Sequence, residues 1–128
     1  LQYLIMKSFI SVDSKKYFSK KLTYLEKDKK ISIVMDTKLN KKIKPLVKNS
    51  DIFISEGTYD SSMKEEAKEK MHLTVGQVAS VAKSAKVEKL IITHVSSRYL
   101  KNMNSLLGEA KAIFPETVLV KDLDSFII

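Results

Sequence analysis

The chain has 128 residues, of which 44% are apolar, with three glycines, two prolines and no cysteine. This composition is typical of one small globular domain with a buried core, and it argues against a disordered chain and a disulfide framework. The net charge is +8 and lies in the first half, because residues 1–48 hold 13 Lys and 4 acidic residues whereas residues 49–128 hold 10 basic and 11 acidic ones. Such a lysine-rich segment attracts polyanions, although solubility alone explains it equally well.

The sequence is compatible with a reducing compartment. It has no cysteine and no apolar run of the roughly 20 residues that a membrane span needs. Its apolar start at Leu1 lacks the basic segment and the cleavage site of a signal peptide. We therefore expect a cytoplasmic protein without a membrane partner, and a chain that is part of a larger protein.

The first third of the chain favours strands. Residues 3–12 and 20–26 are rich in aromatic, β-branched and leucine residues. A polar turn at 27–29 leads from the second run into the apolar run 31–35, which predicts a hairpin between them.

A short helix and a buried strand follow. Residues 39–48 carry apolar side chains at helical spacing, and Pro45 favours a start of the regular helix near Lys44. The apolar run 51–56 predicts a compact strand that Gly57 ends.

Two capping patterns indicate the next helices. Ser62 with Glu65 predicts a helix over 63–71, and Thr74 with Gln77 predicts an amphipathic helix of about three turns.

The last third repeats the alternation of strand and helix. Residues 90–92 predict a strand, and Asn102 or Asn104 can cap a helix that ends before Pro115. Residues 118–120 and 126–128 predict two closing strands. This order, with nearly continuous apolar strands, indicates an α/β fold in a single domain over 1–128.

Ionisable residues follow three successive predicted strands. Asp36, Glu56 and His94 stand at the carboxyl ends of these strands, and His72 precedes the Thr74 cap. If the strands are parallel, these side chains meet at the sheet edge where open α/β sheets bind ligands. Each residue taken alone has an ordinary structural explanation, such as a helix cap or a surface position. Together, one Asp, one Glu and two His suit metal binding or proton transfer near neutral pH.

The motifs around these residues resemble the C-terminal half of ribonuclease Z, the tRNA 3′-processing endoribonuclease of the metallo-β-lactamase superfamily. The resemblance covers roughly residues 30–122. It rests on Met35-Asp36-Thr37, on residues 51–59, on His72-Leu73-Thr74 and above all on residues 93–99, THVSSRY, which look like the His-x-Ser-x-Arg-Tyr motif of this family.

The resemblance implies a fold, a reaction and roles for particular residues. The fold would be half of an αββα sandwich, with a mixed sheet covered by helices, and the reaction would be zinc-dependent removal of 3′ trailers from precursor tRNA. Asp36 matches the aspartate that bridges two zinc ions and His94 matches a final zinc ligand. Glu56 and His72 match a catalytic proton relay. Substrate contacts would come from Ser97, Arg98 and Tyr99.

The sequence also departs from this family. Where many members have His-Glu-Ala-Thr, this chain has Ser55-Glu56-Gly57-Thr58. The His-x-His-x-Asp-His cluster that supplies most zinc ligands in the family is absent, as is the segment expected to follow it. With His72 and His94 as its only histidines, the chain cannot assemble a binuclear centre alone. We therefore expect the 128 residues by themselves to be inactive.

Two alternatives remain open at this stage. The chain could belong to another hydrolase or phosphodiesterase of the metallo-β-lactamase fold, or it could be a non-catalytic module that dimerises or binds nucleic acid through its lysines. An isolated half would expose a sheet face that its missing part normally covers, which favours a homodimer.

Overall fold

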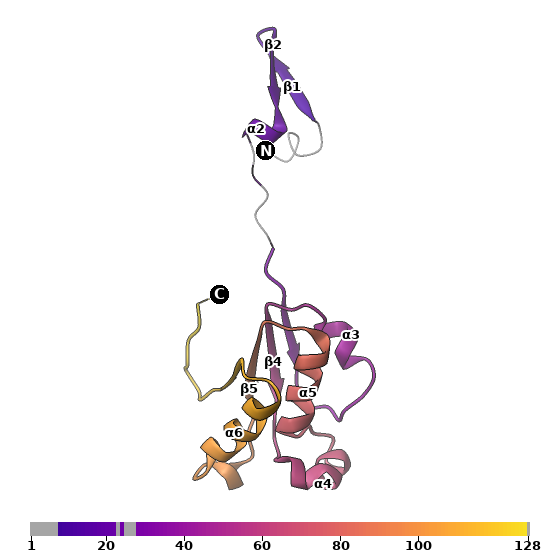
Figure 1. Cartoon of the computed structure of the whole chain (residues 1–128), viewed down its shortest axis with the longest axis vertical. Coiled ribbons are helices and arrows are strands. Elements are labelled where there is room, and N and C mark those ends of the chain that lie inside the picture. Colours follow the sequence, from indigo (N-terminus) through magenta and orange to yellow (C-terminus); the bar gives the residue numbers. More distant parts are fainter. Residues whose placement is uncertain (1–7, 23, 25–27, 128) are drawn as a thin grey trace.

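The computed structural model describes residues 8–22, 24 and 28–127. Near the N-terminus, strands β1 (Phe9–Val12) and β2 (Lys15–Phe18) form an antiparallel hairpin, and helix α2 (Ser19–Leu22) follows directly. Figure 1 shows this hairpin at one end of the molecule, apart from the α/β body.

The body is built on a parallel sheet of four strands. These are β3 (Ile31–Val34), β4 (Ile52–Glu56), β5 (Lys89–Thr93) and β6 (Thr117–Leu119), in the spatial order β3-β4-β5-β6. All three neighbouring pairs run parallel, so the carboxyl ends of the strands share one edge. The strand and helix alternation predicted from the sequence is confirmed, and with it the α/β class.

Helices connect the strands. The connections contain α3 (Ile43–Val47) after β3, and a 3₁₀ turn η1 (Ser61–Met63), α4 (Lys64–Glu69) and α5 (Val75–Ala85) after β4. A second 3₁₀ turn, η2 (Ser97–Tyr99), and α6 (Met103–Ile113) lie between β5 and β6. None of the helices in the described part of the chain is long and apolar enough to cross a membrane.

The core lies between one face of the sheet and α5. Phe53, Leu90 and Ile92 of the sheet are fully buried, as are Ala79 and Ala82 of α5. The helix is amphipathic, as its sequence predicts, because every third or fourth residue faces the sheet.

The edge strand β3 is less covered on its other face. Its side chains alternate, so that Ser32 and Val34 are buried whereas Ile31 and Ile33 are 46% and 61% exposed. Successive residues of a strand point to opposite faces. The face opposite the helices therefore carries exposed isoleucines at its β3 edge.

The predicted hairpin between residues 20–26 and 31–35 is wrong. Residues 31–34 instead pair in parallel with β4, and residues 20–22 are helical. The observed hairpin turns at Asp13 and Ser14, whose φ angles of 49° and 64° suit a tight two-residue turn. Residues 3–7, 23, 25 and 26 of the predicted strands and residue 27 of the predicted turn lie outside the described residues.

Three smaller expectations also need correction. Residues 126–127 form no strand, and residue 128 lies outside the described part. The predicted helix over 63–71 is shorter, and it is preceded by η1, whose N-cap is Asp60 and not Ser62. Asn102 occupies the N-cap of α6 without a capping side-chain bond.

The Thr74 prediction is confirmed. Thr74 and Gln77 form a complete capping box at the start of α5, with reciprocal bonds between side chain and backbone. The box fixes the first turn of α5, directly after His72.

Candidate metal and catalytic site

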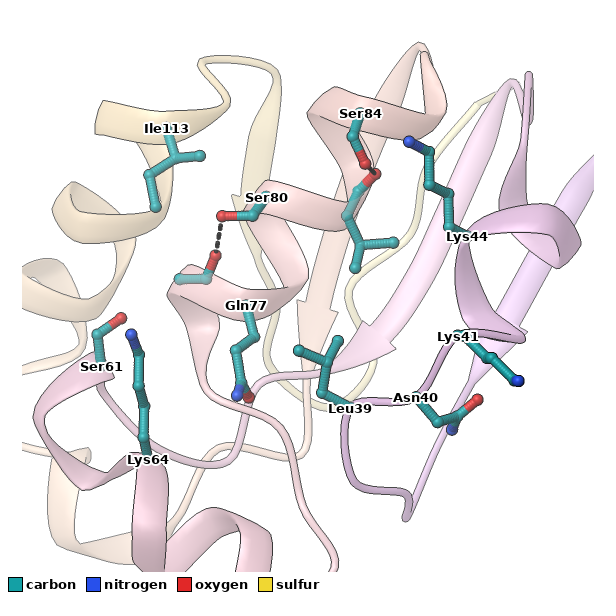
Figure 2. Close-up of a pocket in the computed structure, with 12 residues that line it drawn as sticks. Leu39, Asn40, Lys41, Lys44, Ser61, Lys64, Gln77, Ser80, Ser84 and Ile113 are labelled. Carbon is teal, nitrogen blue, oxygen red and sulfur yellow. Dashed lines mark hydrogen bonds between the residues drawn. The ribbon is translucent and has the colours of Figure 1, made fainter.

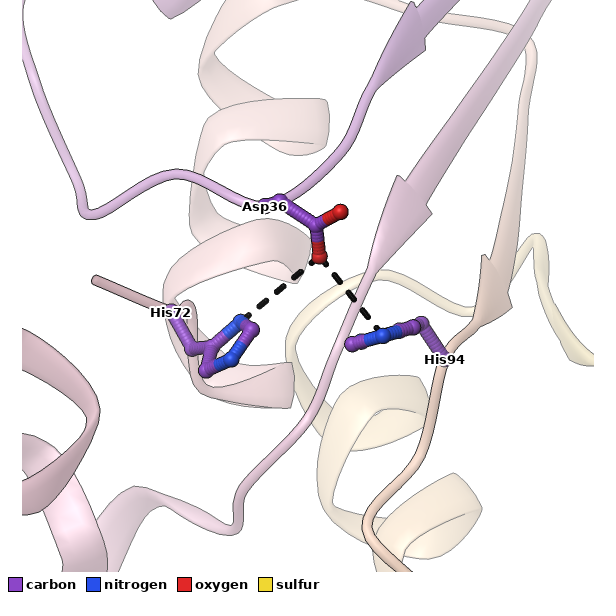
Figure 3. Close-up of side chains that lie close together, drawn as sticks. All are labelled: Asp36, His72 and His94. Atoms are coloured by element: carbon purple, nitrogen blue, oxygen red, sulfur yellow. Dashed lines mark ion pairs between the residues drawn. The ribbon is translucent and has the colours of Figure 1, made fainter. Parts of the chain in front are cut away.

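Residues from four segments of the chain meet at the carboxyl edge of the sheet. Asp36 follows β3, Glu56 ends β4, His94 follows β5, and His72 comes from the connection between α4 and α5. Asp36 Oδ1 lies 3.6 Å from His94 Nε2 and 4.0 Å from His72 Nδ1, as Figure 3 shows. The sequence prediction that these four side chains converge agrees with this geometry.

The backbone at the strand ends turns sharply. Asp36 has a φ of 48° and His94 a φ of 54°, in the left-handed region that non-glycine residues rarely adopt. Such a conformation costs about 1 to 2 kcal/mol per residue, so the surrounding contacts must hold it. The chain turns away from the strand direction at Asp36 and at His94, which are the residues that follow β3 and β5.

Glu56 is a fully buried carboxylate whose oxygens are both bound. Its Oε1 accepts from the Thr37 backbone N–H at 2.7 Å. Its Oε2 accepts from the Leu73 backbone N–H at 3.1 Å and from the Thr58 hydroxyl at 2.7 Å, and it lies 2.9 Å from His72 Nδ1. A buried charge is tolerated when its hydrogen-bonding capacity is filled in this way. Glu56 therefore ties the Asp36 loop and the His72 loop together.

Thr58 connects Glu56 to the second histidine. Besides its bond to Glu56, its Oγ1 lies 3.1 Å from His94 Nδ1 and 3.0 Å from the His94 carbonyl oxygen. A hydroxyl has one proton, and the carboxylate is both the nearest and the strongest acceptor. Because the hydroxyl proton is used for Glu56, the Thr58 oxygen accepts a hydrogen bond from His94 Nδ1–H. His94 Nε2 is then the unprotonated nitrogen, and it lies beside Asp36. Sequence reasoning missed Thr58, although it lies two residues after Glu56.

Gly57 allows the strand end to pack closely. A Cβ atom placed on Gly57 would lie 2.6 Å from Ile92 Cγ2 and 3.0 Å from Val75 Cγ1. Both distances are shorter than ordinary van der Waals contact. Glycine at this position thus lets the end of β4 lie against β5 and α5.

Asp36, His72 and His94 have the composition of a metal site. One ligand atom from each lies within 4.8 Å of the other two. Two imidazole nitrogens and a carboxylate oxygen form a donor set that suits zinc and other first-row metals. The histidine positions are fixed from behind by Glu56 and Thr58, which is the usual arrangement around metal-binding histidines.

Ser97, Arg98 and Tyr99, the predicted substrate contacts, form η2 directly after the His94 loop. Arg98 is bound to Glu66, with Nη2 3.0 Å from Oε1. Lys70, at 2.7 Å, and Arg98 lower the pKa of Glu66. Burial raises the pKa of Tyr99, whose hydroxyl oxygen accepts from the Asp60 backbone N–H at 3.4 Å. This structure therefore holds Arg98 and Tyr99 through contacts with the connection that carries η1 and α4.

Comparison with solved structures defines the class of protein. The chain is similar to the metallo-β-lactamase fold protein YhfI from Bacillus subtilis, with a TM-score of 0.64 and 22% identity over 71% of this chain and 35% of that one. It is also similar to human tRNase Z, short form, with a TM-score of 0.50 and 27% identity over 67% of this chain and 27% of that one. The chain thus has the fold of a part of a metallo-β-lactamase-type protein.

Sequence relatives identify the family. Ribonuclease Z of Treponema denticola is 44% identical over 97 residues, which are 75% of this chain and 32% of that protein. Ribonuclease Z of Listeria monocytogenes serotype 4b (strain F2365) is 42% identical over 116 residues, which are 90% of this chain and 37% of that protein. The chain is a homologue of ribonuclease Z, as its motifs indicated. It spans about a third of the length of these relatives, and no protein-family model matches it.

Proposed function

We propose that this chain is the C-terminal part of a zinc-dependent endoribonuclease that removes 3′ trailers from precursor tRNA. The observation that carries the proposal is the convergence of Asp36, Glu56, His72 and His94 at one sheet edge, in a chain whose relatives are named ribonuclease Z. A cytoplasmic location, a homodimer and a single domain over 1–128 stay predictions of the sequence.

The donor set at the sheet edge fits the implied zinc. Asp36 and His94 would hold it, with His94 Nε2 turned toward the carboxylate. The zinc ions of a complete centre would activate water and stabilise the oxygens of a phosphodiester during cleavage. The remaining ligands would have to come from outside this chain, because it has only two histidines and no cysteine.

His72 is positioned to move a proton. Its Nδ1 faces the buried Glu56 carboxylate at 2.9 Å, so that Nδ1 carries the proton bonded to Glu56 and Nε2 gives or takes the second one. We assign to His72 Nε2 the protonation of the leaving ribose oxygen. Glu56 keeps the His72 ring oriented during this proton transfer, and its hydrogen bonds to Thr37, Thr58 and Leu73 stay in place.

Arg98 and Tyr99 would contact the substrate backbone after leaving their present partners. Arg98 is 43% exposed and is bound to Glu66, whose side chain is 24% exposed. The guanidinium fork binds phosphate bidentately as it binds carboxylate. Substrate binding would thus exchange the Glu66 contact for a phosphate contact.

The test supplies the missing part. We would produce the chain together with the complementary N-terminal part of the Treponema denticola relative and assay a precursor tRNA with a labelled 3′ trailer. We expect cleavage only when both parts and zinc are present, with a loss of at least 10²-fold for His72→Ala. A matched Lys111→Gln variant, whose side chain is exposed on α6, should cleave normally.

Other outcomes would contradict the proposal. Turnover by the 128-residue chain alone that disappears in His94→Ala would show a complete site within these residues. Hydrolysis of a simple phosphodiester without cleavage of precursor tRNA would favour another hydrolase of this fold. Metal-independent, salt-sensitive RNA binding without any cleavage by the two-part enzyme would favour the non-catalytic module.

A further inference from the structure

A long groove lies between α3 and α5, outside the metal and catalytic site. It consists of two adjoining cavities of about 780 and 660 Å³, which share Lys41, Lys44 and Ser84 as lining residues. Figure 2 shows the larger cavity, with Lys64 at one end and Lys44 at the other. We call the two cavities together the α3–α5 groove.

The charge of the groove is uniformly positive. No acidic side chain lines it within the described part of the chain. None of its lysines forms an ion pair with another described residue. One carboxylate lies against the lining: Glu109 accepts from the Ser61 backbone N–H at 3.1 Å and also from the Ser61 hydroxyl. The lysines that line the groove are Lys41, Lys44, Lys48, Lys64 and Lys86.

Apart from the lysines, the larger cavity is lined mainly by apolar surface, which includes Leu39, Val81 and Ile113, and by a few serine hydroxyls and amide groups. No aromatic residue or arginine lines either cavity, although these residues dominate the binding energy of protein interfaces. Aromatic residues are also the usual platform for stacked bases. Lysines on a shallow groove instead favour phosphates, which bind them without regard to sequence.

One end of the groove is lined by the loop that carries Asp36. Leu39, Asn40 and Lys41 belong to the same loop as Asp36, and the backbone N–H of Thr37 in this loop binds Glu56. From there the groove follows α5, whose 11 residues rise about 16 Å. A polynucleotide that passes the catalytic edge can therefore continue along α5 over several phosphates.

We propose that the α3–α5 groove binds the sugar-phosphate backbone of the RNA substrate beyond the reacting phosphate. This inference rests on the proposed function, since it takes the substrate to be RNA. The groove contributes affinity without base specificity, and it holds the strand on the outer, helix-covered side of the sheet.

The test measures RNA binding by the 128-residue chain without metal. A fluorescent 12-nucleotide single-stranded RNA is titrated in the presence of a chelator at several salt concentrations, with fluorescence anisotropy as the readout. The groove variant combines Lys41→Gln, Lys44→Gln and Lys86→Gln. The control variant combines Lys21→Gln, Lys68→Gln and Lys111→Gln, which removes the same charge from exposed positions outside the groove.

We expect the groove variant to bind at least tenfold more weakly at low salt, and its plot of log K against log salt to be flatter by about 2, since each lost phosphate contact removes about 0.7. The control variant should keep most of its affinity and slope. Equal losses in both variants, an unchanged groove variant, or tighter binding of polyglutamate than of RNA would each overturn the proposal. If the groove binds RNA but the two-part enzyme does not cleave, the proposed function alone is contradicted. If the two-part enzyme cleaves but the groove variant keeps its RNA affinity, this inference alone is contradicted.

Discussion

Glu56 organises the site although it directly contacts neither of the proposed zinc ligands, Asp36 and His94. It reaches His72 by a direct contact and His94 through the Thr58 hydroxyl. One buried carboxylate therefore sets the orientation of both histidine rings. The sequence predicts Glu56 at the end of a strand, but it does not predict that the Thr58 hydroxyl links Glu56 to His94.

The tautomer of His94 depends on Thr58. In Thr58→Val the ring loses its acceptor at Nδ1, and we expect the neutral ring to move from the Nδ1–H form toward the Nε2–H form. Nitrogen NMR of the imidazoles reports this change directly, and the chain has only two histidines to assign.

Two controls accompany this experiment. Thr58→Ser keeps the hydroxyl and should keep the wild-type nitrogen shifts of His94. His72, which is bound to Glu56 directly, should keep its own shifts in both variants. An Nε2–H tautomer already present in the wild-type chain would contradict the role assigned to Thr58.

Among the elements, the parallel strands were the easiest to predict. Their apolar runs are nearly continuous, most residues of the central strands β4 and β5 are buried, and the strand ends carry Asp36, Glu56 and His94. The first hairpin was harder, since its turn at Asp13 and Ser14 lacks the glycine that usually marks such turns. Thr58 and the Arg98–Glu66 pair could not be predicted because they join residues 36 and 32 positions apart.

The capping pattern at Ser62 predicts an N-cap two residues after the observed one, Asp60. Ser62 followed by Glu65 has the form of a capping box, yet Asp60 accepts from the backbone N–H of Ser62 at 2.9 Å and from its hydroxyl at 2.5 Å. The Ser62 hydroxyl is thereby used as a donor and does not cap α4. The carboxylate two residues earlier is the better acceptor because it is charged.

We expect Asp60→Ala to lower the free energy of unfolding by about 1 kcal/mol at neutral pH. Because bonds from Ser62 hold the folded pKa of Asp60 below 3.8, the stabilisation is present above that value and disappears as the pH falls through the folded pKa. Urea unfolding between pH 3 and 7 measures the difference. Asp122→Ala, at an exposed position of the C-terminal segment, should show neither effect, and a constant difference across this range would contradict the charged cap.

On the scale of the whole molecule, the sheet is covered by helices on one face and carries exposed isoleucines on the other. Ile33 at 61% and Ile31 at 46% exposed are unusual for β-branched residues in a strand, and β3 is also the edge of the sheet. Exposed apolar edge strands favour association with another chain. The N-terminal part that the proposed function requires, or a second copy of the chain, would cover this surface.

We therefore expect the isolated chain to self-associate, and Ile33→Lys to shift it toward the monomer. Sedimentation equilibrium over a range of concentrations measures this shift. Leu46→Lys is the matched control, because Leu46 is 56% exposed but lies on α3. A monomeric wild-type chain, or an equal response to both variants, would exclude the β3 face as the contact.

The close approach at Gly57 also limits how this sequence can vary. An alanine there, as in the His-Glu-Ala-Thr motif that the chain resembles, would strike the Cγ2 methyl of Ile92. We expect Gly57→Ala to destabilise the fold by about 1 to 3 kcal/mol, and Ile92→Leu, which moves the branch away from the backbone, to restore much of this loss. Thermal unfolding of the two single variants and the double variant tests this coupling. If the changes in the free energy of unfolding of the single variants simply add up in the double variant, the coupling is contradicted. Positions 57 and 92 would then have to change together during evolution. The glycine that replaces the alanine of the His-Glu-Ala-Thr motif in this chain would thus be coupled to the isoleucine at position 92.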